Sequence, residues 1–179
     1  MFVYASLSPE EQDAVKALRY AIKVEQNGLI TYIKLARKTK DITGKNMLIG
    51  LARDEFYHMI TLEKQLESIV ENHRWIKVDI EESEIEKLVP KISEYIGRIK
   101  GERALSEEDA LQVALSQEKQ SIDFYKEQYE KAQTPEAKEM FRRLIEMEES
   151  HYNLILAQLD YIKKTGFWFG IPEFTMEHT

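Results

Sequence analysis

The sequence contains no cysteine, only seven glycines and four prolines, and no long apolar run. Without cysteine the chain can form no disulfide, use no thiolate in catalysis, and hold neither a zinc finger nor an iron–sulfur cluster. No stretch reaches membrane-spanning length and the N-terminus lacks a signal-like segment, so the expected location is the cytoplasm. Charged residues are 32% of the 179, and the net charge of −7 argues against a nucleic-acid or anionic-membrane surface.

The few glycines and prolines fall mostly between periodic apolar stretches, which predicts an all-α fold. Helix-start signals at Ser8-Pro9, Asp41, Ser106 and Thr134-Pro135, and a stop at Gly166, predict four long helices. They should cover about residues 9–40, 42–71, 106–133 and 135–165. Short loops within each pair indicate two antiparallel hairpins, and the long segment 72–106 indicates a crossover, as in one-crossover four-helix bundles. Residues 1–166 would form this bundle.

The two predicted hairpins repeat each other. Residues 18–66 overlay residues 111–159 without a gap at an offset of 93, and twelve of these 49 pairs are identical. Each half carries a lone glutamate on an apolar helix face and, 30 residues later, a Glu-x-x-His on another. We therefore expect one hairpin used twice about a pseudo-twofold axis. The repeated polar residues are Glu25, Glu55 and His58 in the first half and Glu118, Glu148 and His151 in the second.

These six residues should meet inside the bundle. At the helical rise of 1.5 Å per residue, all four glutamates lie roughly 20 Å from their hairpin turns. Four ionised carboxylates would repel one another strongly in a core, and the adjacent core-facing positions offer no lysine or arginine. Two divalent cations would neutralise them, and carboxylate with imidazole suits iron or manganese better than structural zinc. The alternative interpretation is surface charges or helix–helix salt bridges, which do not belong on apolar stripes.

The stretches "KVEQNGLITYIKLARKTKDITGKNMLIGLARDEFYHMITL" and "SQEKQSIDFYKEQYEKAQTPEAKEMFRRLIEMEESHYNLI" resemble the rubrerythrin-like branch of the ferritin-like superfamily, over residues 9–165. The resemblance implies a ferritin-like bundle with two iron ions held by Glu25, Glu55, His58, Glu118, Glu148 and His151. It also implies that Tyr32 and Tyr125 orient ligand carboxylates, although buried tyrosines also occur as ordinary core residues.

The resemblance implies a peroxidase that reduces hydrogen peroxide to water with electrons from the diferrous site. This chain departs from the family pattern in two ways. It lacks the four-cysteine rubredoxin segment, so an external electron donor, such as a rubredoxin-like protein, is expected. It also has Ser121, matched by Gly28 in the first half, where the family carries an extra carboxylate. The alternatives are a ferroxidase or iron-handling protein that uses dioxygen or peroxide, and a non-enzymatic bundle held together by metal.

The last segment, residues 167–179, should pack on the bundle or on a partner subunit, which would make a homodimer. It gathers five large apolar side chains that would otherwise form an exposed patch: Phe167, Trp168, Phe169, Phe174 and Met176. Trp75 and Tyr95 of the crossover should cover the bundle. His73 and His178 have no matching companions and are expected to be exposed.

Overall fold

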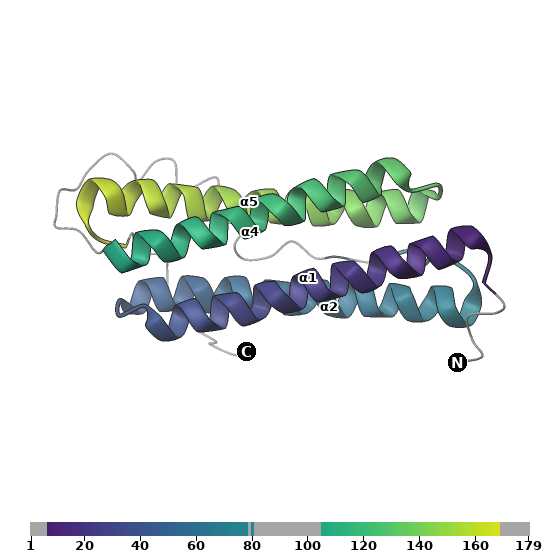
Figure 1. Ribbon diagram of the computed structural model, residues 1–179, viewed down its shortest axis with the longest axis horizontal. Coiled ribbons are helices and arrows are strands. Elements are labelled where there is room, and N and C mark those ends of the chain that lie inside the picture. The colour runs from purple at the N-terminus through teal and green to yellow at the C-terminus, as the bar shows by residue number, and fades with distance from the viewer. Residues whose placement is uncertain (1–6, 79, 81–104, 169–179) are drawn as a thin grey trace, which may run out of the picture.

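The computed structural model describes residues 7–78, 80 and 105–168 and contains four helices within them. They are α1 (Pro9–Lys38), α2 (Ile42–Asn72), α4 (Leu105–Lys131) and α5 (Pro135–Thr165). The α1–α2 hairpin forms one layer and the α4–α5 hairpin the other, side by side along the long axis (Figure 1). The predicted all-α four-helix bundle of two antiparallel hairpins is confirmed.

The helices start at the predicted signals. Ser8 and Glu11 form a reciprocal capping box, in which the Glu11 amide donates to Ser8 Oγ and the Ser8 amide donates to Glu11 Oε2. Asp41 accepts from the first amides of α2, and Thr134 accepts from the Ala137 amide of α5. Helix α4 differs slightly from the prediction because it begins at Leu105, before the expected cap Ser106. Helices α1 and α4 end about two residues early, a normal margin for helix ends.

Contacts between helices are concentrated within the two hairpins, whose turns are only three residues long. Helices α1 and α4, one from each layer, also run next to each other, but they make far fewer contacts. We call this boundary the α1–α4 seam. It is the side of the bundle that faces the viewer in Figure 1.

The apolar core is divided into two blocks along the bundle. One block gathers residues from the end at which α1 meets α2, including Tyr32, Leu51, Leu111 and Leu159. The other gathers residues from the opposite end, including Leu18, Leu62, Tyr125 and Leu144. The stretch between the two blocks contains one predicted metal-ligand position in α1 and in α4, and two in α2 and in α5. A polar layer thus crosses the middle of the bundle with apolar packing on both sides.

The repeat continues past the two hairpins. His73 and Gly166, 93 residues apart, both cap their helices in the left-handed backbone conformation, with φ of 53° and 79°. Two residues later, Trp75 lies with its ring centroid 6.0 Å from that of Phe141, and the equivalent Trp168 is buried in the first core block. Both hairpins therefore end by folding a tryptophan back onto the bundle.

Most of the predicted crossover and tail lies outside the described residues, including Tyr95, Phe169, Phe174, Met176 and His178. Of the tail, Phe167 is exposed, whereas Trp168 donates its indole N–H to Glu107 of the same chain at 2.8 Å. His73 is exposed, as expected, with Nδ1 at 3.2 Å from Glu11 Oε1. Among the described residues, no helix combines the length and the hydropathy that spanning a bilayer requires.

Candidate metal centre

All six predicted ligand residues meet in the polar layer, where they form two overlapping groups. The first group is Glu25, Glu55, His58 and Glu148, and the second is Glu55, Glu118, Glu148 and His151. Within each group, one ligand atom per residue lies within 4.8 Å of all the others. Glu55 and Glu148 belong to both groups. This is the arrangement expected of two carboxylates that bridge a pair of ions.

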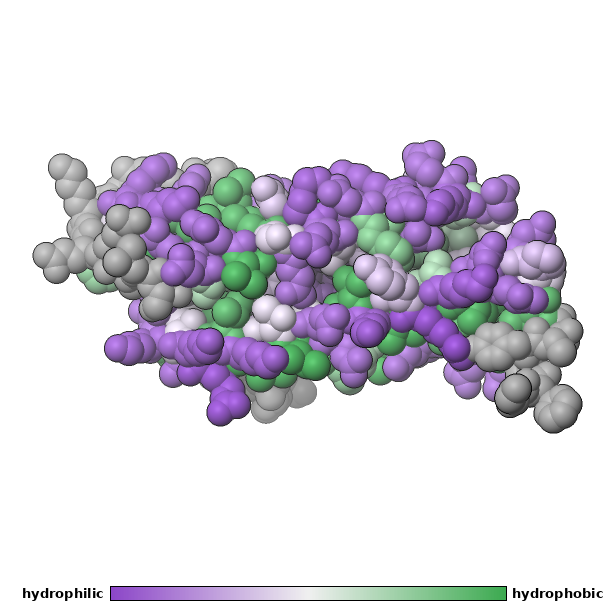
Figure 2. Space-filling model, viewed as in Figure 1, coloured by the Kyte–Doolittle hydropathy of each residue, from purple (hydrophilic) through white to green (hydrophobic). Residues whose placement is uncertain are grey.

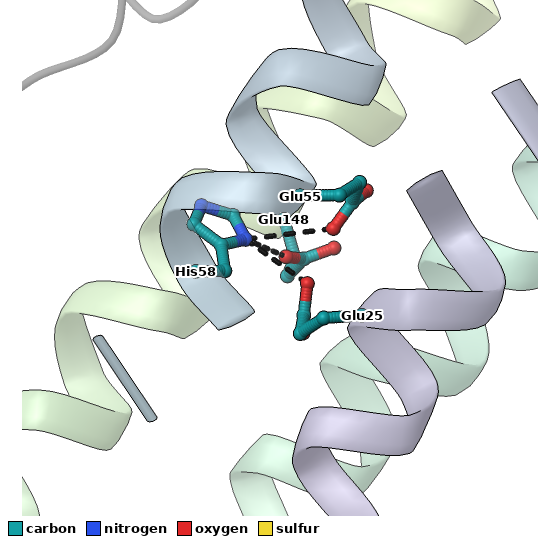
Figure 3. Close-up of side chains that lie close together, drawn as sticks. All are labelled: Glu25, Glu55, His58 and Glu148. Carbon is teal, nitrogen blue, oxygen red and sulfur yellow. Dashed lines mark hydrogen bonds and ion pairs between the residues drawn. The ribbon is translucent and has the colours of Figure 1, made fainter. Parts of the chain in front are cut away.

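In the first group the carboxylates surround one ring nitrogen of His58 (Figure 3). Nδ1 of His58 lies 3.2 Å from Glu25, 3.0 Å from Glu148 and 3.5 Å from Glu55. These side chains come from α1, α2 and α5, so three helices converge on one point.

The second group repeats this arrangement more loosely around His151. Its Nδ1 lies 3.8 Å from both Glu55 Oε1 and Glu118 Oε2. The two imidazole rings are nearly parallel, with an interplanar angle of 16° and centroids 5.6 Å apart. Both histidines therefore turn the same nitrogen, Nδ1, toward the carboxylates.

The chemistry of this cluster fits metal ions. None of the six residues is more than 3% exposed. Of their polar atoms that face the two groups, Glu118 Oε2, both carboxylate oxygens of Glu148 and His151 Nδ1 have no hydrogen-bond partner among the described residues; His58 Nε2, on the far side of its ring, has none either. Buried polar atoms without partners are costly, and the unpartnered atoms that face the groups are oxygens and an imidazole nitrogen aimed at a shared point. Hard oxygen donors with imidazole and no thiolate suit iron or manganese.

The pKa values of the cluster show the electrostatic strain of bringing these groups together. Burial, followed by the charges of neighbouring glutamates, holds the pKa values of Glu55 and Glu148 well above the ordinary range. For His58, burial alone would lower the pKa, but the carboxylates of Glu148, Glu25 and Glu55 around its Nδ1 outweigh burial and raise the pKa well above 6.5. The pKa of His151 is raised in the same way, with Asp54 and Glu118 outweighing burial. Without metal, protons must take the place of the missing positive charge.

Each predicted tyrosine reaches across the α1–α4 seam to the lone glutamate of the other half. The Tyr32 hydroxyl donates to Glu118 Oε1, and the Tyr125 hydroxyl donates to Glu25 Oε1. Both tyrosines are fully buried. Burial and the Glu25 charge raise the pKa of Tyr125 well above 10, so its hydroxyl keeps the proton that it donates. The two hydrogen bonds fix the orientation of Glu25 and Glu118 from opposite helices.

Asp54 is a site residue that sequence reasoning missed. It is 3% exposed, and its Oδ2 lies 3.3 Å from Nε2 of His151, the ring nitrogen that faces away from the second group. Burial alone would raise the pKa of Asp54, but the hydrogen bond and the charge of His151 outweigh it and lower the pKa. A carboxylate in this place holds the ring and the tautomer of a metal-binding histidine. The repeat gave no signal, because the equivalent residue in the second half is Met147.

Ser121, at the position where the family carries an extra carboxylate, and its counterpart Gly28 are both buried. A Cβ atom on Gly28 would lie 3.1 Å from Cδ of Glu55 and 3.0 Å from Nε2 of Gln117. Glu55 and Gln117 thus occupy the space that a side chain at residue 28 would need. Neither position contributes a ligand to the two groups.

The fold and the cluster together define the class: a four-helix bundle of two hairpins with a buried carboxylate–histidine site for two metal ions. The rubrerythrin family model matches residues 16–159, which is most of the chain. The chain belongs to the rubrerythrin family, and its buried cluster fits the di-iron site of that family. No curated protein and no solved structure matched the chain.

Proposed function

We propose that this protein is a non-haem di-iron oxidoreductase that reduces hydrogen peroxide to water with electrons from a separate donor. The observation that carries the proposal is the overlap of the two ligand groups, which share Glu55 and Glu148. Bridging carboxylates hold two ions close enough to act on one small molecule.

When bound by these residues, two ferrous ions would supply the two electrons that, with two protons, convert hydrogen peroxide into two water molecules. The chain contributes the positions of the ligands. Tyr125 and Tyr32 hold Glu25 and Glu118 by hydrogen bonds from across the seam. Asp54 holds the ring of His151. Because these partners are themselves buried, and the two tyrosines belong to the apolar blocks on either side, the ligands are preorganised before any metal or substrate arrives.

The proposed electron donor is external to these 179 residues. With no cysteine in 179 residues, the chain cannot build a rubredoxin-type iron site as an internal electron carrier. The proposed donor is therefore another protein of that kind or a small reductant, which reduces the site after each turnover.

The test begins with the metal content of the protein reloaded anaerobically with Fe²⁺. We expect two irons per chain, and we expect Glu55→Ala and Glu148→Ala each to lose both, because these glutamates belong to both groups. Glu149→Ala is the matched control, since Glu149 is the next residue along α5 and pairs with Lys126 at the surface. Rapid mixing of the diferrous protein with peroxide should then oxidise both irons in one step.

Three results would contradict the proposal in different ways. Absence of bound metal would remove the di-iron site. Iron accumulating beyond two per chain would indicate a ferroxidase or iron-handling protein. Two bound ions that react with neither peroxide nor dioxygen would indicate a site that only holds the bundle together.

A further inference from the structure

A groove of about 410 Å³ lies along the α1–α4 seam at the height of the metal centre. Its lining includes Val24 on α1 and Gln117 on α4. Each directly precedes a lone glutamate of the cluster, Glu25 or Glu118, which points inward. The groove and the ligand groups therefore lie at the same turns of α1 and α4, on neighbouring faces of these helices.

One lining residue of the groove, Gln117, lies next to a carboxylate that both ligand groups share. Gln117 lines the groove, and its Nε2 lies 3.0 Å from the point that a Gly28 Cβ would occupy. Cδ of Glu55 lies 3.1 Å from the same point. The amide of Gln117 and the carboxylate of Glu55 thus lie close together beside Gly28, which has no side chain to separate them. A side chain at position 28 would have to displace one of these two groups.

The groove is uncharged in a chain that is rich in charge. Of the described residues, those that line it include four polar neutral side chains among apolar and aromatic ones: Asn27, Ser116, Gln117 and Gln120. None of the lining residues is an aspartate, glutamate, lysine or arginine, although these four types make up 32% of the chain. Along the seam, apolar and near-neutral residues interrupt the hydrophilic surface (Figure 2).

This lining discriminates between the small molecules that a di-iron site can meet. A divalent cation is drawn along carboxylates, which the groove lacks. Dioxygen neither donates hydrogen bonds nor needs polar partners. Hydrogen peroxide is neutral, donates two hydrogen bonds and accepts others, and the carboxamides of Asn27, Gln117 and Gln120 offer both donors and acceptors.

We propose that the groove on the α1–α4 seam is the route by which a small, neutral, hydrogen-bonding substrate such as hydrogen peroxide reaches the metal centre, and that the Gln117 carboxamide positions it beside Glu55. The inference rests on the proposed function and adds the path and a positioning residue for the same site.

The lack of cysteine makes a clean blocking experiment possible. Val113 lines the groove and is 56% exposed, so Val113→Cys introduces a single accessible thiol there. Ile33→Cys is the matched control, because Ile33 is 46% exposed on α1 and does not line the groove. Both variants are alkylated with N-ethylmaleimide, which is neutral, and compared with their unmodified forms.

Alkylation of the Val113 variant should slow oxidation of the diferrous protein by peroxide about tenfold or more, because the adduct fills the opening. The same adduct should leave unchanged both the two irons per chain and the rate at which the apoprotein takes up Fe²⁺. The alkylated Ile33 variant should match the unmodified protein in every measurement.

The positioning role of Gln117 is tested by Gln117→Leu, which keeps the bulk but loses the hydrogen bonds. Loss of one such bond should slow the reaction with peroxide about fivefold to tenfold at unchanged metal content. The reaction with dioxygen should change little. Gln117→Asn, which retains the carboxamide, should recover part of the rate with peroxide.

An unchanged peroxide rate in the alkylated Val113 variant would overturn the route. Equal slowing of Fe²⁺ uptake would overturn the assignment to a neutral substrate, and equal slowing toward peroxide and dioxygen in Gln117→Leu would overturn the role of the amide. Failure of the unmodified protein to bind two irons would instead overturn the proposed function itself, and metal analysis separates that case at the start.

Discussion

Asp54 approaches His151 from the side of the imidazole ring that faces away from the glutamates, with Oδ2 at 3.3 Å from Nε2. His58 has no equivalent support, because the residue that matches Asp54 in the repeat is Met147, and Nε2 of His58 has no hydrogen-bond partner among the described residues. The two halves of the metal centre are therefore alike in their ligands but unequal in what holds their histidines.

Removing Asp54 should weaken one metal position more than the other. Asp54→Ala leaves His151 free to rotate or to change tautomer, and loss of such a partner typically lowers metal affinity about 10- to 100-fold. Titration of the apoprotein with Co²⁺, followed by its visible absorption, should change from two similar steps to one tight and one weak step. Asp54→Asn retains an oxygen that can accept from Nε2 and should show a smaller change. Two equally weakened steps would contradict the assignment of Asp54 to one position.

Because Tyr32 and Tyr125 make equivalent hydrogen bonds across the α1–α4 seam, we expect the loss of either hydroxyl to reduce stability by a similar amount. Tyr125→Phe and Tyr32→Phe each remove a hydrogen bond to a buried carboxylate, which should lower the free energy of unfolding by about 1–3 kcal/mol. Chemical denaturation of the apoprotein measures this loss, and Tyr57→Phe, at an exposed position, is the control. In a double-mutant cycle, Tyr125→Phe should couple to Glu25→Gln and be additive with Glu118→Gln. Coupling to Glu118 instead would mean that the hydrogen bonds do not cross the seam as described.

The convergence of the six ligand residues could be predicted from the sequence because helices have a fixed rise. Glu25 and Glu55 lie at equal distances from one turn, and Glu118 and Glu148 from the other, so an antiparallel fold must bring each pair to one level. The apolar neighbours of each residue then specify which face points inward. Neither inference requires knowledge of how the two hairpins meet. That the six residues bind metal remains a prediction.

What could not be predicted depends on contacts between the hairpins. The hydrogen bonds of Tyr32 and Tyr125 join α1 to α4, and the partner of Asp54 lies on α5 rather than on its own hairpin. Periodicity identifies the buried face of a helix but not the residue opposite it. The matching of Trp75 with Trp168, by contrast, was available from the sequence at the same offset of 93, just beyond the 49 aligned pairs.

The contacts of Trp168 indicate that it attaches the end of α5 to the rest of the bundle, so its removal should destabilise the fold. Its ring packs over Gly44, where a Cβ would lie 2.4 Å from the indole Cε2, and its N–H donates to Glu107. Trp168→Ala should lower the free energy of unfolding by about 3–5 kcal/mol. Gly44→Ala should also destabilise, because the methyl group displaces the ring. Phe167→Ala, one residue away and 54% exposed, should be nearly neutral in the same denaturation experiment, and an equal loss there would contradict a specific role for Trp168.

The stability of the apoprotein should fall as the pH rises through the neutral range. Four groups of the cluster have pKa values raised above their ordinary values of 4.5 or 6.5, namely Glu55, Glu148, His58 and His151. A group whose pKa is higher in the folded state than in the unfolded state stabilises the fold fully at any pH below its unfolded-state pKa. That stabilisation is lost as the pH rises toward its folded-state pKa. The loss should begin above pH 4.5 for the two glutamates and above pH 6.5 for the two histidines.

The groups with lowered pKa values do not oppose this trend. The pKa values of Glu25 and Asp54 lie below their ordinary values of 4.5 and 3.8, so both residues are ionised in the folded and unfolded states at neutral pH. Their stabilising contribution is lost only in acid. The pKa of Tyr125 is raised from 10.0, so it affects stability only in alkali. Between acid and alkaline pH, the dependence of apoprotein stability on pH therefore comes from the four cluster groups with raised pKa values.

Metal should reverse the trend, because each bound ion replaces protons on the cluster. The melting temperature of the apoprotein should fall between about pH 5.5 and 8.5, whereas the increase in melting temperature on adding Fe²⁺ or Mn²⁺ anaerobically should grow over the same range. Glu148→Gln removes one of the titrating groups and should make the apoprotein slope shallower, while Glu149→Gln on the same helix should leave it unchanged. An apoprotein that gains stability with rising pH would show that its cluster does not hold these protons. Proton release on metal binding, measured by calorimetry in buffers of different ionisation enthalpy, would then also be absent.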